Sequence, residues 1–127
     1  MRPESAGQAA EVLDLLARAD DLALAAIAAI AHGDDEALSA LVEDRGYLIQ
    51  AAASACEALA ASRPPAETGE RVAAAVRDSV LRGLEVRRAA IQCRDEIATA
   101  LSVLDARQQA SAEYQPGHIY GTIDVRL

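Results

Sequence analysis

Residues 35–61 read DEALSALVEDRGYLIQAAASACEALAA, and the spacing of their apolar residues decides the fold. One stripe runs through this stretch in steps of three and four residues, made of Leu38, Leu41, Arg45, Leu48, Ala52, Cys56 and Leu59, with Val42 and Ile49 widening it. Such steps place side chains on one face of an α-helix, close to the seam of a coiled coil. The stretch therefore predicts an amphipathic helix that packs against other helices.

The residues before this stretch predict a partner helix over residues 3–32. Its heavier apolar residues recur at threes and fours, and they are Val12, Leu13, Leu16, Leu22, Leu24, Ile27 and Ile30. Gly33 suits the end of this helix, because glycine accepts the left-handed backbone that follows many helices. Asp34 or Asp35 is a natural N-cap for the next helix. Because the turn is only a few residues long, the two helices must lie antiparallel.

The residues after the stretch predict a break and then a longer helix over residues 70–112. Two prolines in Ser62-Arg63-Pro64-Pro65 forbid helix continuation, and Arg63 is expected to be extended because it precedes a proline. Thr68 suits the cap of the third helix. At 1.5 Å per residue this helix is about 60 Å long, against about 40 Å for each of the others. We expect it to overhang its neighbours or to bend, with Gly83 as the softest point.

The composition favours an all-α fold of three long antiparallel helices, an elongated bundle or coiled coil with a short irregular C-terminal tail. The 127-residue chain is dominated by the best helix formers and contains no Phe and no Trp. We expect residues 1–113 to form one helical domain. Residues 114–127 would be a tail, either a frayed end or a short docking strand. Since small side chains bury little area each, we expect marginal stability, or added stability from a partner or a second copy.

Charge and cysteine content narrow the class of function. The net charge is −8, and residues 1–61 carry all of it, with eleven acids and three arginines, whereas residues 62–127 hold nine of each. An acidic chain is poorly suited to nucleic acid or an anionic membrane. The polar N-terminus and the lack of an apolar run of about 20 residues predict a cytoplasmic protein. Cys56 and Cys93 are expected to be small buried residues in a reducing compartment.

No residue pattern predicts catalysis, a metal or a cofactor. His32 and His118 have no metal-ligand neighbours, and the chain has no Glu-x-x-His pair, no CxxC motif and no glycine-rich phosphate loop. We therefore expect a protein without enzymatic activity that binds other proteins.

Charged side chains interrupt the apolar pattern at two places. Arg45 lies within the stripe, and two interpretations of it are open. In the first, its aliphatic stem packs in the bundle while its charged head reaches solvent or an acid such as Glu43 or Asp44. In the second, it sets the register of the helices by pairing with an acid of the first helix such as Asp20. The third helix also carries a basic band. The band consists of Arg87, Arg88 and Arg94. Either it is a solvated face whose arginines pair locally with Glu85, Asp95 and Glu96, or it faces the acidic first half of the chain or an acidic client helix.

The layout resembles the flagellar export chaperones FlgN and FliT. Residues 31–49, AHGDDEALSALVEDRGYLI, are similar to the first helix junction of those proteins. The shared features are a Gly-Asp turn, a Glu-Ala-Leu opening and an arginine before a Leu-Ile pair, here Gly33-Asp34, Glu36-Ala37-Leu38, Arg45 and Leu48-Ile49. The wider plan is also similar: two helices, a proline-bearing link, one longer helix, and a short tail with Tyr and Gly.

This resemblance implies a cytoplasmic chaperone of type III secretion. It would bind C-terminal helical segments of hook–filament junction proteins, keep them unassembled and deliver them to the export gate. The expected docking face is apolar and follows the third helix, although the same residues suit a core equally: Val76, Val80, Leu84, Ile91, Ile97, Leu101 and Leu104. Tyr114 and Tyr120 are assigned to delivery.

Two other functions remain open. In the first, the third helix pairs with its own copy, and the protein is a structural coiled-coil homodimer. In the second, the chain is a regulatory adaptor that binds a transcription factor or a secretion ATPase, as FliT-like proteins do.

Overall fold

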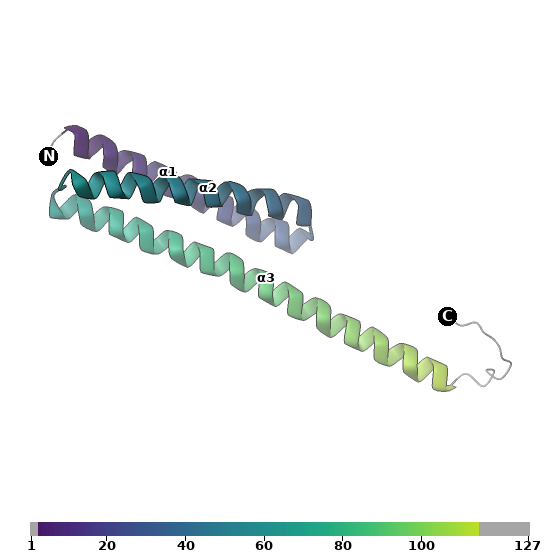
Figure 1. Ribbon diagram of the computed structural model, residues 1–127. Coiled ribbons are helices and arrows are strands. Elements are labelled where there is room, and N and C mark those ends of the chain that lie inside the picture. Colours follow the sequence, from purple (N-terminus) through teal and green to yellow (C-terminus); the bar gives the residue numbers. More distant parts are fainter. Residues whose placement is uncertain (1–2, 115–127) are drawn as a thin grey trace. The chain divides into compact units, whose positions relative to one another are not determined.

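The structure is a computed structural model, and it describes residues 3–114, with side chains from Glu4 to Ala112. It contains three helices: α1 (Pro3–His32), α2 (Asp35–Ala61) and α3 (Ala66–Tyr114), as Figure 1 shows. The described residues contain no strand, so the predicted all-α fold is confirmed. No helix within this range is long and apolar enough to cross a membrane.

The chain divides into two compact units, residues 1–91 and residues 92–127. The first unit holds α1, α2 and the first part of α3, together with the hydrophobic core. The described part of the second unit is the rest of α3, residues 92–114, and all of it is helical. The expected tail, including Tyr120, lies outside the described residues except for Tyr114, which is the last residue of α3.

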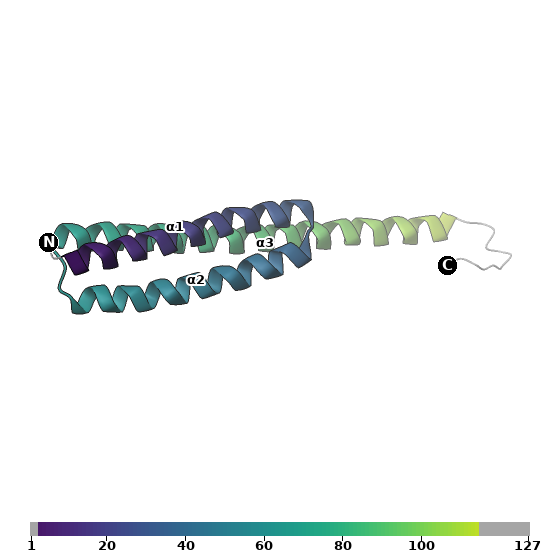
Figure 2. The same cartoon turned by 90° about the horizontal axis from the view of Figure 1, so that it is seen from above.

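The turn between α1 and α2 is as tight as the sequence predicted. Gly33 has a φ of +68° and ends α1, and its amide donates to the Ile30 carbonyl at 3.2 Å while the Asp34 amide donates to the Ala29 carbonyl at 2.9 Å. These two bonds form a Schellman motif. The Asp34 carboxylate then accepts a bond from the Ala37 amide at 3.0 Å, so Asp34 caps α2. The helices consequently run antiparallel (Figure 2).

The buried seam of α1 is made mostly of small side chains. It recurs at threes and fours through Ser5, Ala9, Val12, Leu16, Ala19, Ala23, Ala26 and Ala29, each 7% exposed or less. Of the heavier residues that the sequence placed at helical spacing, Val12 and Leu16 are buried, but those in the second half of α1 are not. There Leu22 and Ile27 are only half-buried and Leu24 is 49% exposed. Close approach of α2 leaves room for alanine alone, because interhelical distance depends on the contacting side chains.

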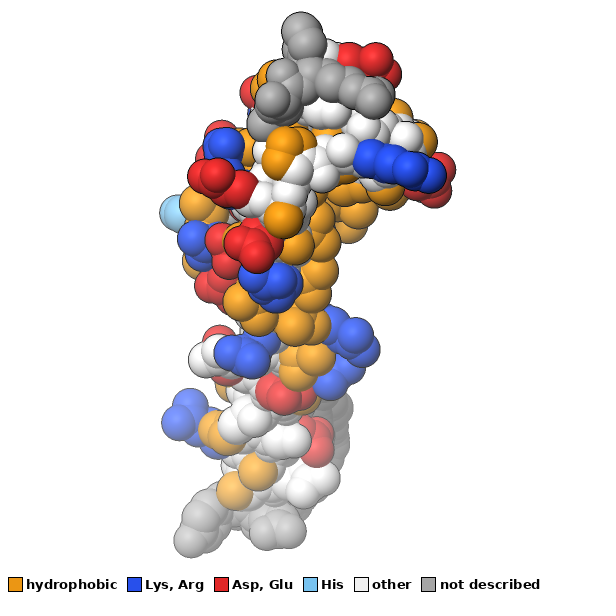
Figure 3. Space-filling view, turned by 90° about the vertical axis from the view of Figure 1, so that its left-hand side faces the viewer, with side chains coloured by type: hydrophobic (Ala, Val, Ile, Leu, Met, Phe, Trp, Pro, Cys, Tyr) orange, Lys and Arg blue, Asp and Glu red, His pale blue; other side chains and the backbone are white. Residues whose placement is uncertain are grey.

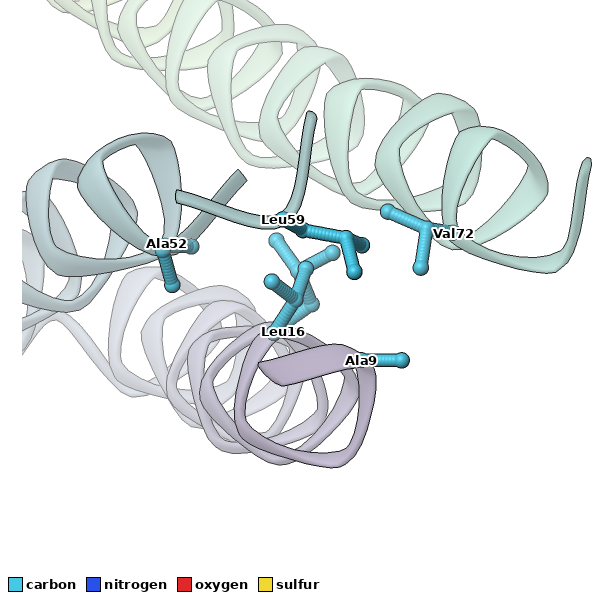
Figure 4. Close-up of a cluster of buried hydrophobic side chains, with 7 residues drawn as sticks. Ala9, Leu16, Ala52, Leu59 and Val72 are labelled. Carbon is cyan, nitrogen blue, oxygen red and sulfur yellow. The ribbon is translucent and has the colours of Figure 1, made fainter. Parts of the chain in front are cut away.

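The larger core residues gather where all three helices meet. Leu16 of α1, Leu59 of α2 and Val72 of α3 converge there, as Figure 4 shows. Val12 belongs to the same cluster and is fully buried. The remaining members of the cluster are alanines, namely Ala9, Ala52 and Ala55. This cluster fixes the start of α3 against the hairpin.

The link between α2 and α3 differs from the prediction in two ways. Arg63 is left-handed rather than extended, with a φ of +51°, and its amide donates to the Ala60 carbonyl at 3.1 Å. The last carbonyl groups of α2 need hydrogen-bond donors, and a left-handed residue after the helix, usually glycine, allows them to be satisfied. At Arg63 this requirement overrides the preference for extended backbone before proline. α3 also begins four residues earlier than expected, since proline is pre-organised for a first helical turn. Thr68 is therefore buried within that turn and does not cap it.

From its first turn onward, α3 faces the hairpin mostly with small and polar residues. Thr68, Val72 and Ser79 are buried, and Ala75 packs on the edge of the core. The steps between these residues are four, three and four, as a helical seam requires. The helix continues without interruption through Gly83, so the expected soft point is not a break.

Candidate partner-binding groove

An apolar groove lies between α2 and α3 in the first unit. Its volume is about 610 Å³, within the range of about 300–1,000 Å³ common for ligand pockets. Its lining comes from all three helices: Leu16 of α1; Arg45, Ile49, Ala52, Ala53 and Cys56 of α2; and Val76, Ser79, Val80, Gly83, Leu84 and Arg87 of α3. Figure 3 shows one face of the molecule on which hydrophobic side chains form a band with arginines beside it.

The groove exists because α3 turns its small residues toward the hairpin and its large ones aside. Two of the exposed wall residues directly follow a seam residue: Val76 follows Ala75, and Val80 follows Ser79. Consecutive residues in an α-helix are about 100° apart around the axis. Val76 and Val80 therefore stand beside the core, whereas Val72, one turn earlier, is part of it.

Arg45 ties α2 to α3 at the groove. Its Nη2 donates to the Ser79 carbonyl oxygen at 2.8 Å and lies 3.4 Å from the Ser79 hydroxyl. Its Nε is buried, and no hydrogen-bond partner for it is found in the described part of the chain. The guanidinium is thus hydrogen-bonded to neutral groups, and it contributes a positive charge to the lining of the groove.

Gly83 lets this guanidinium approach α3 closely. A Cβ added at Gly83 would lie 3.3 Å from Arg45 Nη1 and 3.4 Å from Nη2, which is tighter than ordinary van der Waals contact. The glycine that the sequence suggested as a bend is instead the surface on which Arg45 rests.

The acid partners predicted for Arg45 are not the ones it engages. Among the residues described, it makes no hydrogen bond or ion pair with Glu43, Asp44 or Asp20. The suggestion that Arg45 sets the register of the bundle fits its position better, but the element it engages is α3. The sequence stripe gave no signal for this, because Ser79 is one of several small polar residues on α3.

The basic band of α3 is paired only in part. Arg94 lies 3.5 Å from Asp95, as predicted, whereas Glu85 pairs with Arg82 at 3.1 Å instead of with the band. Within residues 4–112, Arg87 and Arg88 form no ion pair. Of the band, only Arg87 lines the groove.

The seven residues expected to dock a client are all exposed. In the first unit Val76, Val80, Leu84 and Ile91 are 37%, 58%, 48% and 41% exposed, and we call them the proximal cluster. In the second unit Ile97, Leu101 and Leu104 are 56%, 61% and 53% exposed, and we call them the distal cluster. The groove joins three members of the proximal cluster to α2. Sequence reasoning missed its α2 wall, because Ile49, Ala53 and Cys56 lie on or beside the stripe assigned to the core.

Both cysteines are reduced and partly buried. Burial raises the pKa of the Cys56 thiol above its ordinary value, since a thiolate is disfavoured away from water. Its position in the groove wall makes Cys56 a reporter of whatever fills the groove.

The groove offers shape and charge, and its lining carries no pair of residues suited to nucleophilic or acid–base catalysis. Within the described range, no group of three or more His, Cys, Asp or Glu is placed to hold a metal ion. No protein-family model, curated protein or solved structure matches the chain.

Proposed function

We propose that this chain is a cytoplasmic export chaperone that binds amphipathic helical segments of flagellar hook–filament junction proteins and keeps them unassembled before secretion. The observation that carries the proposal is the exposure of large aliphatic side chains on α3, in both the proximal and the distal cluster. Scattered apolar residues are common on protein surfaces, but repeated ones at helical spacing suit the anchors of a partner helix.

The contrast with the core strengthens this proposal. A side chain of this size contributes about 1.5–3 kcal/mol when fully buried, so each half-exposed one leaves a sizeable part of that stabilisation unused. A partner helix that covered several of them would recover this energy. The recovered energy has to exceed the loss of translational, rotational and side-chain freedom on association.

The resemblance to the FlgN and FliT chaperones supplies the identity of the client. It rests on residues 31–49, whose Gly33-Asp34 turn adopts the tight helix junction described above. Delivery to an export gate or contact with a secretion ATPase belongs to the same proposal.

Light scattering on the purified chain tests the proposal. We expect a monomer of 13.3 kDa that gains the mass of one peptide when the C-terminal segment of a hook–filament junction protein is added. A stable dimer that ignores the peptide would identify a structural coiled coil instead. An adaptor would bind its transcription factor or ATPase and leave the junction peptide free.

Matched substitutions then locate the binding surface. Leu101→Glu in the distal cluster and Val80→Glu in the proximal cluster should each weaken peptide binding at least tenfold while the helical circular dichroism is kept. Leu24→Glu is the control, because Leu24 is a leucine of α1 that is about half exposed. Loss of binding in the control as well would show that the effect is not specific to α3.

A further inference from the structure

We infer that the segment filling the α2–α3 groove is an amphipathic helix that carries acidic residues at the C-terminal end of its apolar stripe and lies parallel to α3. This inference rests on the proposed function, and it adds the chemistry and the direction of the partner in the groove.

The first observation is charge. The chain has a net charge of −8, yet the charged residues that line the groove are two arginines, Arg45 and Arg87, and no acid. Neither arginine makes an ion pair with the residues that the structure describes. A partner that covers them without supplying a carboxylate would remove two cations from water uncompensated, which is unfavourable. Charge complementarity therefore selects an acidic segment.

The second observation is that both arginines lie at one end of the groove. Arg45 is the first lining residue of α2, and Arg87 is the last lining residue of α3. Because α2 and α3 run antiparallel, the opposite end is formed by the later residues of α2 and the earlier residues of α3 (Figure 1). Those residues are Ala53 and Cys56 of α2 and Val76 of α3. The groove thus has an apolar end and a cationic end.

The third observation is length. Val76 and Arg87 are eleven residues apart in α3, which corresponds to about 17 Å, or three turns of helix. A partner helix of about twelve residues matches that length. Its C-terminus carries the negative end of the helix dipole and is stabilised by nearby cations, so the C-terminus belongs at Arg45 and Arg87. Since α3 also runs from Val76 toward Arg87, the two helices are parallel.

Titration with three synthetic peptides tests the chemistry. Each is a fourteen-residue amidated amphipathic helix with leucines at positions i, i+3, i+4 and i+7, and each ends in two Glu, two Gln or two Lys. We expect the Glu peptide to bind tightest, with the Gln peptide about fivefold weaker and the Lys peptide weaker again. The differences should shrink in high salt, because exposed charges are screened.

Charge reversal on the protein sharpens the test. Arg87→Glu should abolish the order, because Arg45 and the new carboxylate leave that end of the groove with no net charge, and the three peptides should then bind this variant about equally. Arg88→Glu is the matched control, since it makes the same charge change one residue away and outside the groove, and it should keep the original order. Both arginines are exposed and unpaired within the described residues, so neither variant should unfold the chain. Arg45 is left intact because it holds α2 to α3.

Cross-linking tests the direction. In a Cys93→Ser background, a bromoacetyl group on the N-terminus of the Glu peptide should alkylate Cys56, whereas the same group at the peptide C-terminus should not. Mass spectrometry reads the modified residue.

Each outcome bears on one of the two proposals. Equal binding of the three peptides would overturn the acidic partner and leave helix docking intact, and preferential alkylation from the C-terminus would overturn the parallel direction. If none of the three peptides binds, the groove does not accept a helix and this inference fails, whereas the docking function is decided separately by the junction-protein peptide in light scattering.

Discussion

The α1–α2 hairpin buries alanine, whereas α3 exposes leucine, isoleucine and valine. In α1, Ala19 and Ala23 are fully buried, while on α3 Leu101 is 61% exposed. The distance between helix backbones, and not the size of the side chain, decides which residue is inside. Two helices that approach closely accept only small residues between them, and the larger residues are then left for a surface that something else can cover.

The largest expected difference between the two regions comes from the same truncation made in each. Leu16→Ala removes a side chain at the meeting point of three helices and should lower the free energy of unfolding by about 2–5 kcal/mol. Leu101→Ala on α3 should change it by less than about 0.5 kcal/mol, because that side chain is mostly exposed. Urea unfolding followed by circular dichroism measures both. Equal losses would mean that α3 is as much a part of the core as the hairpin.

Enlarging alanines probes the close approach itself. Ala23→Leu should destabilise the chain by about 1–3 kcal/mol, since the fully buried position has no room for a larger side chain. Ala98→Leu on the exposed surface of α3 is its control and should be close to neutral. Thermal unfolding midpoints compare the two variants. A tolerated leucine at Ala23 would refute tight packing of the hairpin.

The contact between Arg45 of the hairpin and Gly83 of α3 should make the effects of mutating these two residues on the unfolding free energy non-additive. Gly83→Ala should stabilise an isolated helix by about 1 kcal/mol, but here the new methyl group pushes against Arg45. We expect little gain in the wild-type background and most of the gain in an Arg45→Ala background. A double-mutant cycle of unfolding free energies measures this difference. Additive effects would show that Arg45 does not rest on Gly83 in solution.

The smallest effect concerns the pH dependence of Cys56. Its pKa is raised from 9.0 by burial, so the folded state holds the thiol proton more tightly than the unfolded state. This contribution to stability is therefore present below pH 9.0 and is lost as the pH rises through the higher folded pKa. Wild-type protein should lose stability above pH 9 more steeply than Cys56→Ala. If the stability of the two proteins changes with pH in the same way, the Cys56 thiol is exposed to water in the folded state.

Local signals in the sequence were enough for the helices and for the first turn. Steps of three and four residues located α1 and α2, and Gly33 and Asp34 carry the backbone and side-chain properties that their turn needs. The aliphatic residues of α3 were expected to form a docking face because of the resemblance to FlgN and FliT, and their spacing suits that role. Spacing alone could not separate a docking face from a core, because both need apolar residues at the same intervals.

What the sequence could not predict depends on how helices approach one another. The alanine seam of α1 looked like filler between heavier residues, and only the packed hairpin shows that it is the buried side. Likewise Arg45 had several acids near it in sequence, but its partner, Ser79, is 34 residues away on another helix. The left-handed Arg63 was missed because two local preferences conflict there and the end of α2 prevails.

The urea unfolding midpoint of an Ala90→Glu/Ala98→Glu double variant, measured with and without the junction-protein peptide, decides whether α3 presents a docking face. Both alanines are exposed residues of α3 placed among the docking residues. We expect the variant to unfold at the wild-type midpoint without peptide. We expect the peptide to raise the midpoint of the wild type alone, because a ligand stabilises only the state it binds. A variant that is already unfolded without urea would show instead that this face of α3 is core.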